Sequence, residues 1–206
     1  MKRYFVTAIG TDSGKTLAST ILVEALQADY YKPIQCGTDS LDSEYVEKFC
    51  NNTFCRIYSS QFIFKTPASP HEAAEIENKT VSVKDFVFPE NENTLIIEGA
   101  GGLLVPLNYQ GETIADLIES IDSELILVVN LYLGCINHTL LTVNELKRRN
   151  ITVKGIIFNG INNTATKKII LQHSGFKELL HIQQEEHINQ EIIKKYAIEL
   201  MGNFYE

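Results

Sequence analysis

The stretch AIGTDSGKT, at residues 8 to 16, contains the residue types that can hold a phosphate group and a magnesium ion. It follows the apolar run RYFVTAI and opens the helical pattern KTLASTILVEALQ, so it joins a predicted strand to a predicted helix. Backbone N–H groups in such a turn, together with the helix N-terminus, can surround a phosphate. Lys15 would reach the outer phosphates, and Thr16 would offer a hydroxyl oxygen to Mg²⁺. The alternative is an ordinary helix start, in which Asp12 and Ser13 serve as turn and capping residues.

Two charged residues at the ends of other predicted strands support a phosphate site. Glu98 ends the strand in TLIIEGAGG, where an unpaired buried carboxylate would be costly and a Mg²⁺ shared with Thr16 would pair it. The glycines that follow it let the backbone approach a ligand closely. Lys32, in YKPIQCG, would stabilise the charge that develops on a transferring phosphoryl group. The alternatives are a solvated glutamate in a loop and a surface lysine.

The elements that would position these residues alternate along the chain. Continuous apolar runs, which we interpret as buried strands, are separated by amphipathic helical patterns such as NHTLLTVNELKRR. This alternation is typical of a parallel sheet covered on both faces, and the ligands of such sheets bind at the carboxyl ends of the strands. The residues that follow the strands are rich in Gly, Asn, Asp, Glu and Thr, so polar chemistry gathers at one edge. We interpret residues 1–206 as one domain, with strands in RYFVTAI, YYKPIQ, TLIIEGAGG, SELILVVN and VKGIIFN.

Composition excludes several classes of partner. The formal net charge is -8, which makes the protein a poor electrostatic match for nucleic acid or an anionic membrane surface. No apolar run reaches the roughly 18 to 20 residues of a membrane helix. We do not expect the basic and then apolar N-terminus to be a signal peptide, because Asp12 and Lys15 interrupt the apolar run and no A-x-A-like site follows. The four cysteines form no CxxC pair, and we expect reduced thiols and a cytoplasmic protein.

Taken together, the motifs resemble the ATP-dependent dethiobiotin synthetases. The order and spacing of the matching segments fit from residue 3 to about residue 162, and LGCINH is the most specific of them. The resemblance implies a P-loop NTPase-like, three-layer α/β/α fold with a mostly parallel central sheet. In chain order, the matching segments are FVT with the loop ending in GKT, KPIQCG, TPASPH, EGAGGLLVP and LGCINHTLLT.

The phosphate loop of this family is one residue longer than the usual G-x-x-x-x-G-K-[ST] pattern, which explains why Ile9 stands where a glycine is usual. The first glycine of the longer loop would lie six residues before Gly14, and this chain has Ala8 there. A methyl group at that position is tolerable only if φ is negative. We expect Gly10, inside the loop, to supply part of the flexibility that Ala8 lacks.

The resemblance also implies a reaction. CO₂ and 7,8-diaminononanoate (7,8-diaminopelargonate) first form a carbamate, which ATP phosphorylates to a carbamic-phosphoric anhydride. The second amine attacks this anhydride, and the ureido ring of dethiobiotin closes with release of phosphate and ADP. The protein's task is positioning and charge stabilisation, as in other phosphoryl transfers.

By resemblance, the residues of the site fall into four groups. Lys32, Thr11 and Lys15 are the implied catalytic residues. The implied metal ligands for Mg²⁺ are Thr16, Asp42 and Glu98, with Asp39 as the alternative to Asp42. The implied substrate contacts are Cys36, Gly101, Gly102, Cys135, Ile136 and Asn137. The implied nucleotide-binding residues are Asp12, Ser13, Gly14, Lys15, Thr16, Leu17, Asp42, Glu98, Gly99, Ala100, Gly101 and Asn159.

Three of these positions carry more specific expectations. Cys36 stands where the family usually has serine or threonine, and a thiol is a weaker donor than a hydroxyl. Asn159 matches the asparagine that reads the adenine edge. In the family, the segment GCINH serves the active site of the neighbouring subunit, so the resemblance implies a homodimer whose active site lies near the subunit interface. His138 in this segment would otherwise be a solvated residue at a helix start, and His71 in SPH a turn residue.

Two other classes of protein carry a related phosphate loop. A regulatory P-loop ATPase of the MinD or ParA type often carries a second lysine early in the loop, where this chain has Ala8, Ile9 and Gly10. Such proteins also tend to present an amphipathic membrane tail, for which IIKKYAIELMGNFYE is a weak candidate. A cobyrinate-type amide ligase needs an attached glutaminase domain, for which we expect no room in 206 residues.

Overall fold

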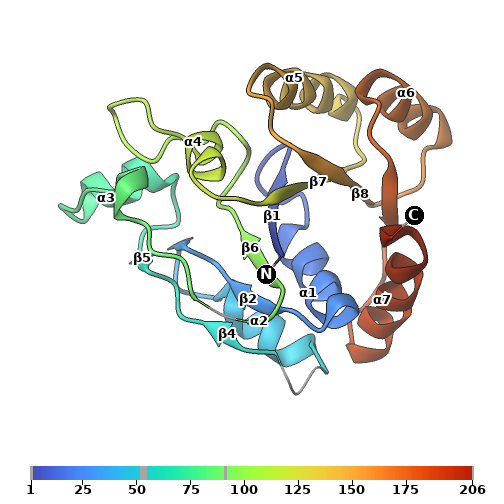
Figure 1. Cartoon of the computed structure of the whole chain (residues 1–206), viewed down its shortest axis with the longest axis horizontal. Coiled ribbons are helices and arrows are strands. Elements are labelled where there is room, and N and C mark those ends of the chain that lie inside the picture. The colour runs from blue at the N-terminus through green and yellow to red at the C-terminus, as the bar shows by residue number, and fades with distance from the viewer. Residues whose placement is uncertain (1, 52–54, 91, 206) are drawn as a thin grey trace.

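A computed structural model describes residues 2–51, 55–90 and 92–205 of the chain. Within these ranges, a central sheet has seven strands, and every neighbouring pair is parallel (Figure 1). The apolar runs of the sequence form its buried middle, as the alternation of strands and helices predicts. In spatial order the strands are β4 (Ile57–Tyr58), β2 (Asp29–Tyr31), β6 (Leu95–Glu98), β1 (Arg3–Ala8), β7 (Glu124–Asn130), β8 (Val153–Asn159) and β9 (Glu178–Ile182).

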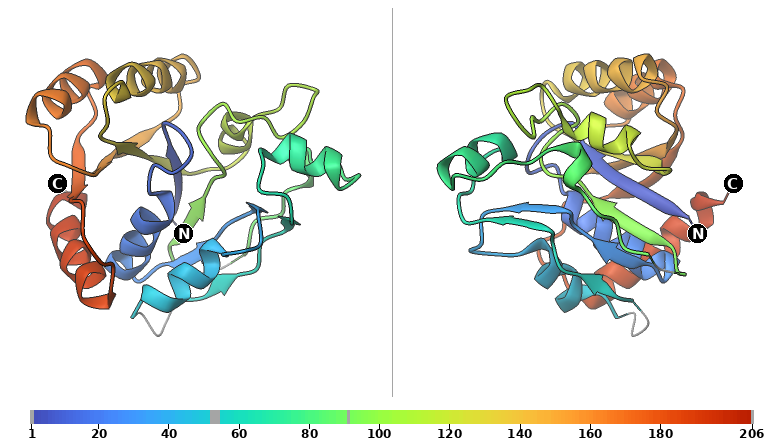
Figure 2. Two further views of the ribbon diagram at one scale, coloured as in Figure 1. Left: turned by 180° about the vertical axis from the view of Figure 1, so that it is seen from behind. Right: turned by 60° about the vertical axis from the view of Figure 1, so that its left-hand side comes forward.

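Helices cover both faces of this sheet, which gives three layers (Figures 1 and 2). One face carries α4 (Ile114–Glu119), α5 (Cys135–Arg148) and α6 (Thr164–Ser174). The other face carries α1 (Lys15–Leu26), α2 (Asp42–Phe49) and α7 (Gln190–Phe204).

Each face has its own apolar core, because successive side chains of a strand point to opposite faces. Strand β1 accordingly sends Phe5 into one core and Tyr4 and Val6 into the other. Two buried layers around one sheet fix the position of every strand end, and the strand ends carry the polar residues of interest.

A second, smaller sheet lies beside the first. It pairs β3 (Ile34–Cys36) with β5 (Phe62–Phe64) in parallel, and α3 (Pro70–Ile76) and the 3₁₀ turn η1 (Val83–Asp85) follow it in the chain. The predicted single strand over YYKPIQ is therefore wrong, because the chain leaves the large sheet after Tyr31 and enters the small one at Ile34. Pro33 lies at the break: it has no N–H to donate, and its carbonyl accepts from the N–H groups of Gln61 and Phe62 at 3.1 and 3.0 Å.

The C-terminal helix belongs to the core. Tyr196, Leu200 and Phe204 of α7 are buried between the sheet and α1. The opposite side of the segment leaves Ile198, Met201 and Tyr205 exposed. In the described part of the chain, no helix is both long enough and apolar enough to cross a bilayer.

Candidate active site

The phosphate loop runs from the end of β1 to the start of α1. Ala8 is the last residue of β1 and pairs with Val128, so its backbone is extended and its φ is not positive, as predicted. The left-handed conformations fall on Asp12, with φ 56°, and on Gly14, with φ 90°. Gly10 does not have a positive φ, and an added Cβ would meet nothing within 4 Å, so the left-handed part of the turn does not depend on Gly10. Asp12 and Gly14 therefore shape the turn.

Gly14 is required for a second reason. A Cβ at this position would lie 2.3 Å from Nδ2 of Asn159, which is the last residue of β8. That amide nitrogen donates to the Ser13 carbonyl at 3.1 Å. The loop is therefore packed directly against the carboxyl end of the neighbouring strand, with no space for a side chain between them.

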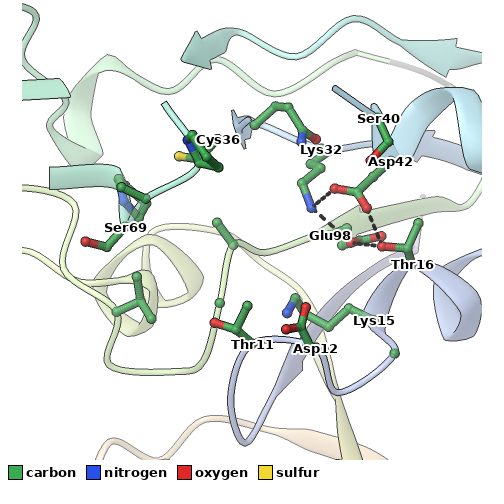
Figure 3. A pocket seen from close by; sticks show the side chains of 18 residues that line it. Thr11, Asp12, Lys15, Thr16, Lys32, Cys36, Ser40, Asp42, Ser69 and Glu98 are labelled. Carbon is green, nitrogen blue, oxygen red and sulfur yellow. Dashed lines mark hydrogen bonds and ion pairs between the residues drawn. The ribbon is translucent and has the colours of Figure 1, made fainter. Parts of the chain in front are cut away.

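Near Lys15, a cluster of one hydroxyl, two carboxylates and one ammonium group connects four segments of the chain (Figure 3). The Thr16 hydroxyl lies 2.5 Å from Oδ1 of Asp42 and 2.9 Å from Oε1 of Glu98. The Lys32 ammonium group lies 2.6 Å from Oδ2 of Asp42 and 3.0 Å from Oε1 of Glu98. The loop, the end of β2 and the end of β6 thus meet at one point, together with the start of α2.

Burial sets the electrostatics of this cluster. Glu98 is 0% exposed and Lys32 6% exposed. Burial alone would lower the pKa of Lys32, but the carboxylates of Glu98 and Asp42 outweigh it and raise that pKa. Burial likewise opposes the charge of Asp42, and the Lys32 ammonium group outweighs it and lowers the Asp42 pKa. The pKa of Lys15 is lowered, because burial dominates over the attraction of Glu98.

Tyr30 is a member of the cluster that the sequence did not reveal. Its hydroxyl donates to Oε2 of Glu98 at 2.9 Å, and the ring is fully buried in β2. Burial, reinforced by the charge of Glu98, raises the Tyr30 pKa well above its ordinary value, so the hydroxyl stays protonated and donates. A tyrosine inside an apolar strand looks like a core residue, and only the packing of β2 beside β6 gives it this role.

The donor set fits a hard divalent cation. Thr16, Asp42 and Glu98 offer oxygen atoms only, and oxygen ligands are those that Mg²⁺ prefers. An ammonium group already lies between the two carboxylates, so the position attracts positive charge. Asp39, the alternative ligand, is exposed and does not line the cavity described next, whereas Asp42 is the first residue of α2 and joins the cluster.

In front of the cluster lies a cavity of about 720 Å³ (Figure 3). Thr11 and Asp12 line it from the phosphate loop, and Cys36 lines it from the opposite side. Sequence reasoning missed the wall that Pro67 and Ser69 contribute, since TPASPH shows turn signals but no obvious ligand chemistry. The residues implied by the family resemblance that line this cavity are Thr11, Asp12, Gly14, Lys15, Thr16, Lys32, Cys36, Asp42, Glu98, Ala100 and Gly101.

Cys36 presents a neutral thiol to this cavity. It is half-buried at the end of β3, and burial raises its pKa to about 11. At neutral pH the group is therefore a weak hydrogen-bond donor with no charge.

Five of the implied residues lie beside the cavity without lining it, and one of them is Asn159, which packs against Gly14. Ser13 is buried behind the loop, at 1% exposed. Leu17 is half-buried and packs against the core beneath α1, and Gly99 packs beside Phe5. Gly102 lies against the phosphate loop, since a Cβ there would come within 3.3 Å of the Ala8 carbonyl oxygen.

The GCINH segment, residues 134 to 138, does not line the cavity near Lys15. Cys135 and Ile136 line a separate cavity of about 310 Å³, and Asn137 is exposed at the start of α5. The Cys135 side chain is buried, and its N–H donates to the Tyr132 carbonyl at 3.0 Å. Within one chain these residues do not reach the cavity near Lys15. His138 contacts the Tyr132 hydroxyl.

Comparison with known proteins identifies the family. A family model described as an AAA domain matches residues 2–192. The ATP-dependent dethiobiotin synthetase BioD of Cytophaga hutchinsonii is 52% identical over 207 residues, which covers 100% of both chains. The chain belongs to the ATP-dependent dethiobiotin synthetase family. The dethiobiotin synthetase BioD of Christiangramia forsetii is 45% identical over 197 residues, or 95% of this chain and 94% of its own.

Solved structures place the dethiobiotin synthetase chain in a wider fold group. A putative plasmid partition protein of Borrelia burgdorferi, bound to AMPPNP, superposes with a TM-score of 0.63 at 13% identity, covering 99% of this chain and 98% of the other. The cell division ATPase MinD of Pyrococcus furiosus gives 0.57 at 14% identity, covering 98% and 99%. At such low identity the likeness concerns the fold alone. The expected P-loop NTPase-like, three-layer architecture is confirmed.

Proposed function

We propose that the chain uses ATP and Mg²⁺ to make dethiobiotin from 7,8-diaminononanoate and CO₂. The observation that carries this proposal is the convergence of Lys15, Thr16, Lys32, Asp42 and Glu98 beside one cavity. A cation at the triphosphate and a buried lysine beside it form an electrostatic site for phosphoryl transfer. Family membership supplies the substrate.

The reaction balances in three steps. One amine of the substrate adds to CO₂ and loses a proton, which gives a carbamate. A carbamate oxygen attacks the γ-phosphorus, the bond to ADP breaks, and a carbamic-phosphoric anhydride results. The second amine attacks the carbonyl carbon, loses a proton and expels phosphate, which closes the ring. The chain holds the reacting atoms in line, which turns encounters in solution into steps within one complex.

We assign the charges of the site as follows. The loop N–H groups and Lys15 bind the triphosphate, because a helix start with a buried lysine attracts anions. Thr16, Asp42 and Glu98 would hold Mg²⁺, which supplies charge neutralisation at the phosphate oxygens. Thr11 lies at the mouth of the loop, where its hydroxyl can meet the transferred phosphate.

Lys32 would stabilise the negative charge of the carbamate and of the phosphoryl group during its transfer. In the structure its ammonium group is bound to Asp42 and Glu98. We infer that the lysine exchanges these carboxylates for substrate oxygens once a divalent cation takes over their charge. Cys36 and Gly101, which line the same cavity, would contact the diamine, and Asn159 the adenine.

We infer a homodimer from the placement of GCINH. The segment lies away from the chain's own cavity, next to apolar side chains that are unusually open to solvent. Leu133 is fully exposed, and Tyr132 and Ile161 are 43% and 69% exposed. These three side chains line one cavity, and such a grouping of exposed apolar side chains supports a protein interface here. A second copy seated here would bring Cys135, Ile136 and Asn137 to the substrate of its neighbour.

A single incorporation experiment tests the proposal. The protein is mixed with 7,8-diaminononanoate, ¹⁴C-bicarbonate, MgCl₂ and ATP, and acid-stable label in dethiobiotin is counted. We expect stoichiometric label and ADP, and no label if either ATP or MgCl₂ is omitted. ATP hydrolysis without incorporated label would contradict the proposal and favour a regulatory ATPase. Tyr196, Leu200 and Phe204 are buried within the fold and are not free to insert into a membrane, whereas Ile198, Met201 and Tyr205 of the same segment are exposed.

A further inference from the structure

Ser13 is a buried residue of the phosphate loop, and two asparagines hold it. Its side chain is 1% exposed, and its hydroxyl donates to Oδ1 of Asn130 at 2.9 Å. The same hydroxyl lies 3.0 Å from the Gly10 carbonyl, across the turn. The Ser13 carbonyl accepts from Nδ2 of Asn159 at 3.1 Å. Both the side chain and the backbone of this one residue are thus fixed from outside the loop.

The two asparagines form a matched pair on the sheet. Asn130 is the last residue of β7, Asn159 is the last residue of β8, and the two are direct register partners in this parallel pair. Register partners in neighbouring strands point to the same face of a sheet. The five residues before Asn130 and the four before Asn159 are fully buried, so the pair is mounted on rigid elements.

The loop needs such support at this point. Asp12 and Gly14, on either side of Ser13, are both left-handed, with φ of 56° and 90°. A left-handed aspartate is strained relative to a helical or extended one, and strained residues persist only where surrounding contacts determine them. Lys15 and Thr16 follow immediately, so the orientation of Ser13 sets where the lysine and the helix N–H groups point.

We propose that Asn130 is a positioning residue for ATP, which acts through Ser13 and beside Asn159 to hold the phosphate loop in its binding shape. Asn130 does not line the cavity near Lys15, so its effect passes through the loop. This positioning role depends on the proposed function in one respect, which is that the phosphate loop binds ATP. Its mechanism is preorganisation: a loop that is already shaped does not lose binding free energy to ordering.

The test measures binding of AMP-PNP with Mg²⁺ by titration calorimetry for the wild type, Ser13→Ala, Asn130→Leu and the double variant. Loss of one neutral hydrogen bond should weaken binding about threefold to tenfold. Because both single changes remove the same bond, the double variant should bind no more weakly than the worse single variant. The KM for ATP should rise by a similar factor, with the KM for 7,8-diaminononanoate unchanged.

A matched control removes a different asparagine bond. Asn189 caps α7 by accepting from the N–H of Ile192 at 2.9 Å, so Asn189→Leu loses the same kind of contact away from the loop. It should lower the melting temperature without changing the Kd for AMP-PNP. If Asn130→Leu does not fold, Asn130→Ala serves in its place, because it removes the acceptor without adding bulk.

Three results would overturn the proposal: an unchanged Kd in Asn130→Leu, losses that multiply in the double variant, or a raised diamine KM with AMP-PNP binding intact. Binding of AMP-PNP is measured apart from dethiobiotin formation. A wild type that binds AMP-PNP and makes no dethiobiotin would refute the proposed function and leave this proposal standing. A wild type that makes dethiobiotin, together with an unchanged Kd for AMP-PNP in Asn130→Leu, would refute the positioning role alone.

Discussion

The carboxyl edge of the sheet has two halves with different chemistry. At β1, β2 and β6 the strand ends meet charged side chains, namely Lys15, Lys32 and Glu98. At β7 and β8 the strand ends carry neutral amides, Asn130 and Asn159. We call these the charged half and the amide half. The phosphate loop lies between them, and each half contacts it from its own side.

The difference reflects what each half must do. Charges are costly to bury, and Glu98 remains stable at 0% exposure because Thr16, Lys32 and Tyr30 all bind its carboxylate. Such groups suit a site where charge moves during a reaction. Amides carry no net charge and donate and accept at once, so they can hold a backbone without altering the field at the phosphates.

The largest effect that we expect comes from Lys32→Ala, in the charged half. Removal of this ammonium group should lower kcat by about 10² to 10³, which is typical for the loss of one group that stabilises transition-state charge. The Kd for AMP-PNP should change little, because Lys15 and the loop remain. Steady-state kinetics and calorimetry would measure the two quantities. Near-normal dethiobiotin formation in this variant would show that Lys32 has no catalytic role.

The same variant should also expose the cost of the buried carboxylates. Without Lys32, Asp42 and Glu98 lose their cation, and loss of one partner of a buried pair costs about 3–5 kcal/mol. In EDTA the melting temperature of Lys32→Ala should therefore lie below that of the wild type. Addition of MgCl₂ should raise the melting temperature of the variant by more than it raises that of the wild type. Lys79→Ala is the matched control, since the Lys79 side chain is 52% exposed and pairs with Glu77 at 3.3 Å. An equal MgCl₂ response in all three proteins would argue against a metal site at these carboxylates.

Next in size is Gly14→Ala, at the border with the amide half. A methyl group would have to tolerate φ of 90° and would lie 2.3 Å from the Asn159 amide. A left-handed residue alone costs about 1–3 kcal/mol, so AMP-PNP binding should weaken more than tenfold. Gly10→Ala should change binding little, because its φ is not positive and a Cβ there meets nothing within 4 Å. Equal losses in the two variants would mean that general loop mobility, not this contact, governs binding.

The smallest expected effect belongs to Cys36→Ser. A hydroxyl is a stronger donor than the protonated thiol, so the KM for 7,8-diaminononanoate should stay the same or fall by a few-fold. The wild-type KM is measured in parallel, with the KM for ATP as an internal control. A large rise in the diamine KM would instead mean that the sulfur packs against the substrate.

The sequence predicts the framework of the site well, for a physical reason. Strands buried on both faces must be apolar throughout, so RYFVTAI and VKGIIFN stand out, and Glu98 is conspicuous because an acid at such a strand end needs a partner. Asp42 is predicted as a metal ligand because it stands at the start of a helix. Asp39 is an alternative from the sequence alone, and the structure leaves Asp39 exposed.

Other features depend on contacts between distant segments. Tyr30 looks like any core aromatic until β2 pairs with β6. Proline is tolerated in an edge strand, so Pro33 alone does not predict that YYKPIQ is divided between two sheets. The serine of the loop suggests a ligand contact, yet Ser13 is buried against Asn130, which lies 117 positions later.

These separations bear on how the protein is made. The loop motif is complete once residue 16 has been synthesised, but Asn159 is 146 positions further along than Ser13. Both sheet neighbours of β1 also come late, from residues 95–98 and 124–130. A nascent chain that ends before residue 159 therefore carries the nucleotide motif without the contacts that shape it. Contacts between segments this far apart make folding slow, and the loop gains its contact with Asn159 only after β8 has been made.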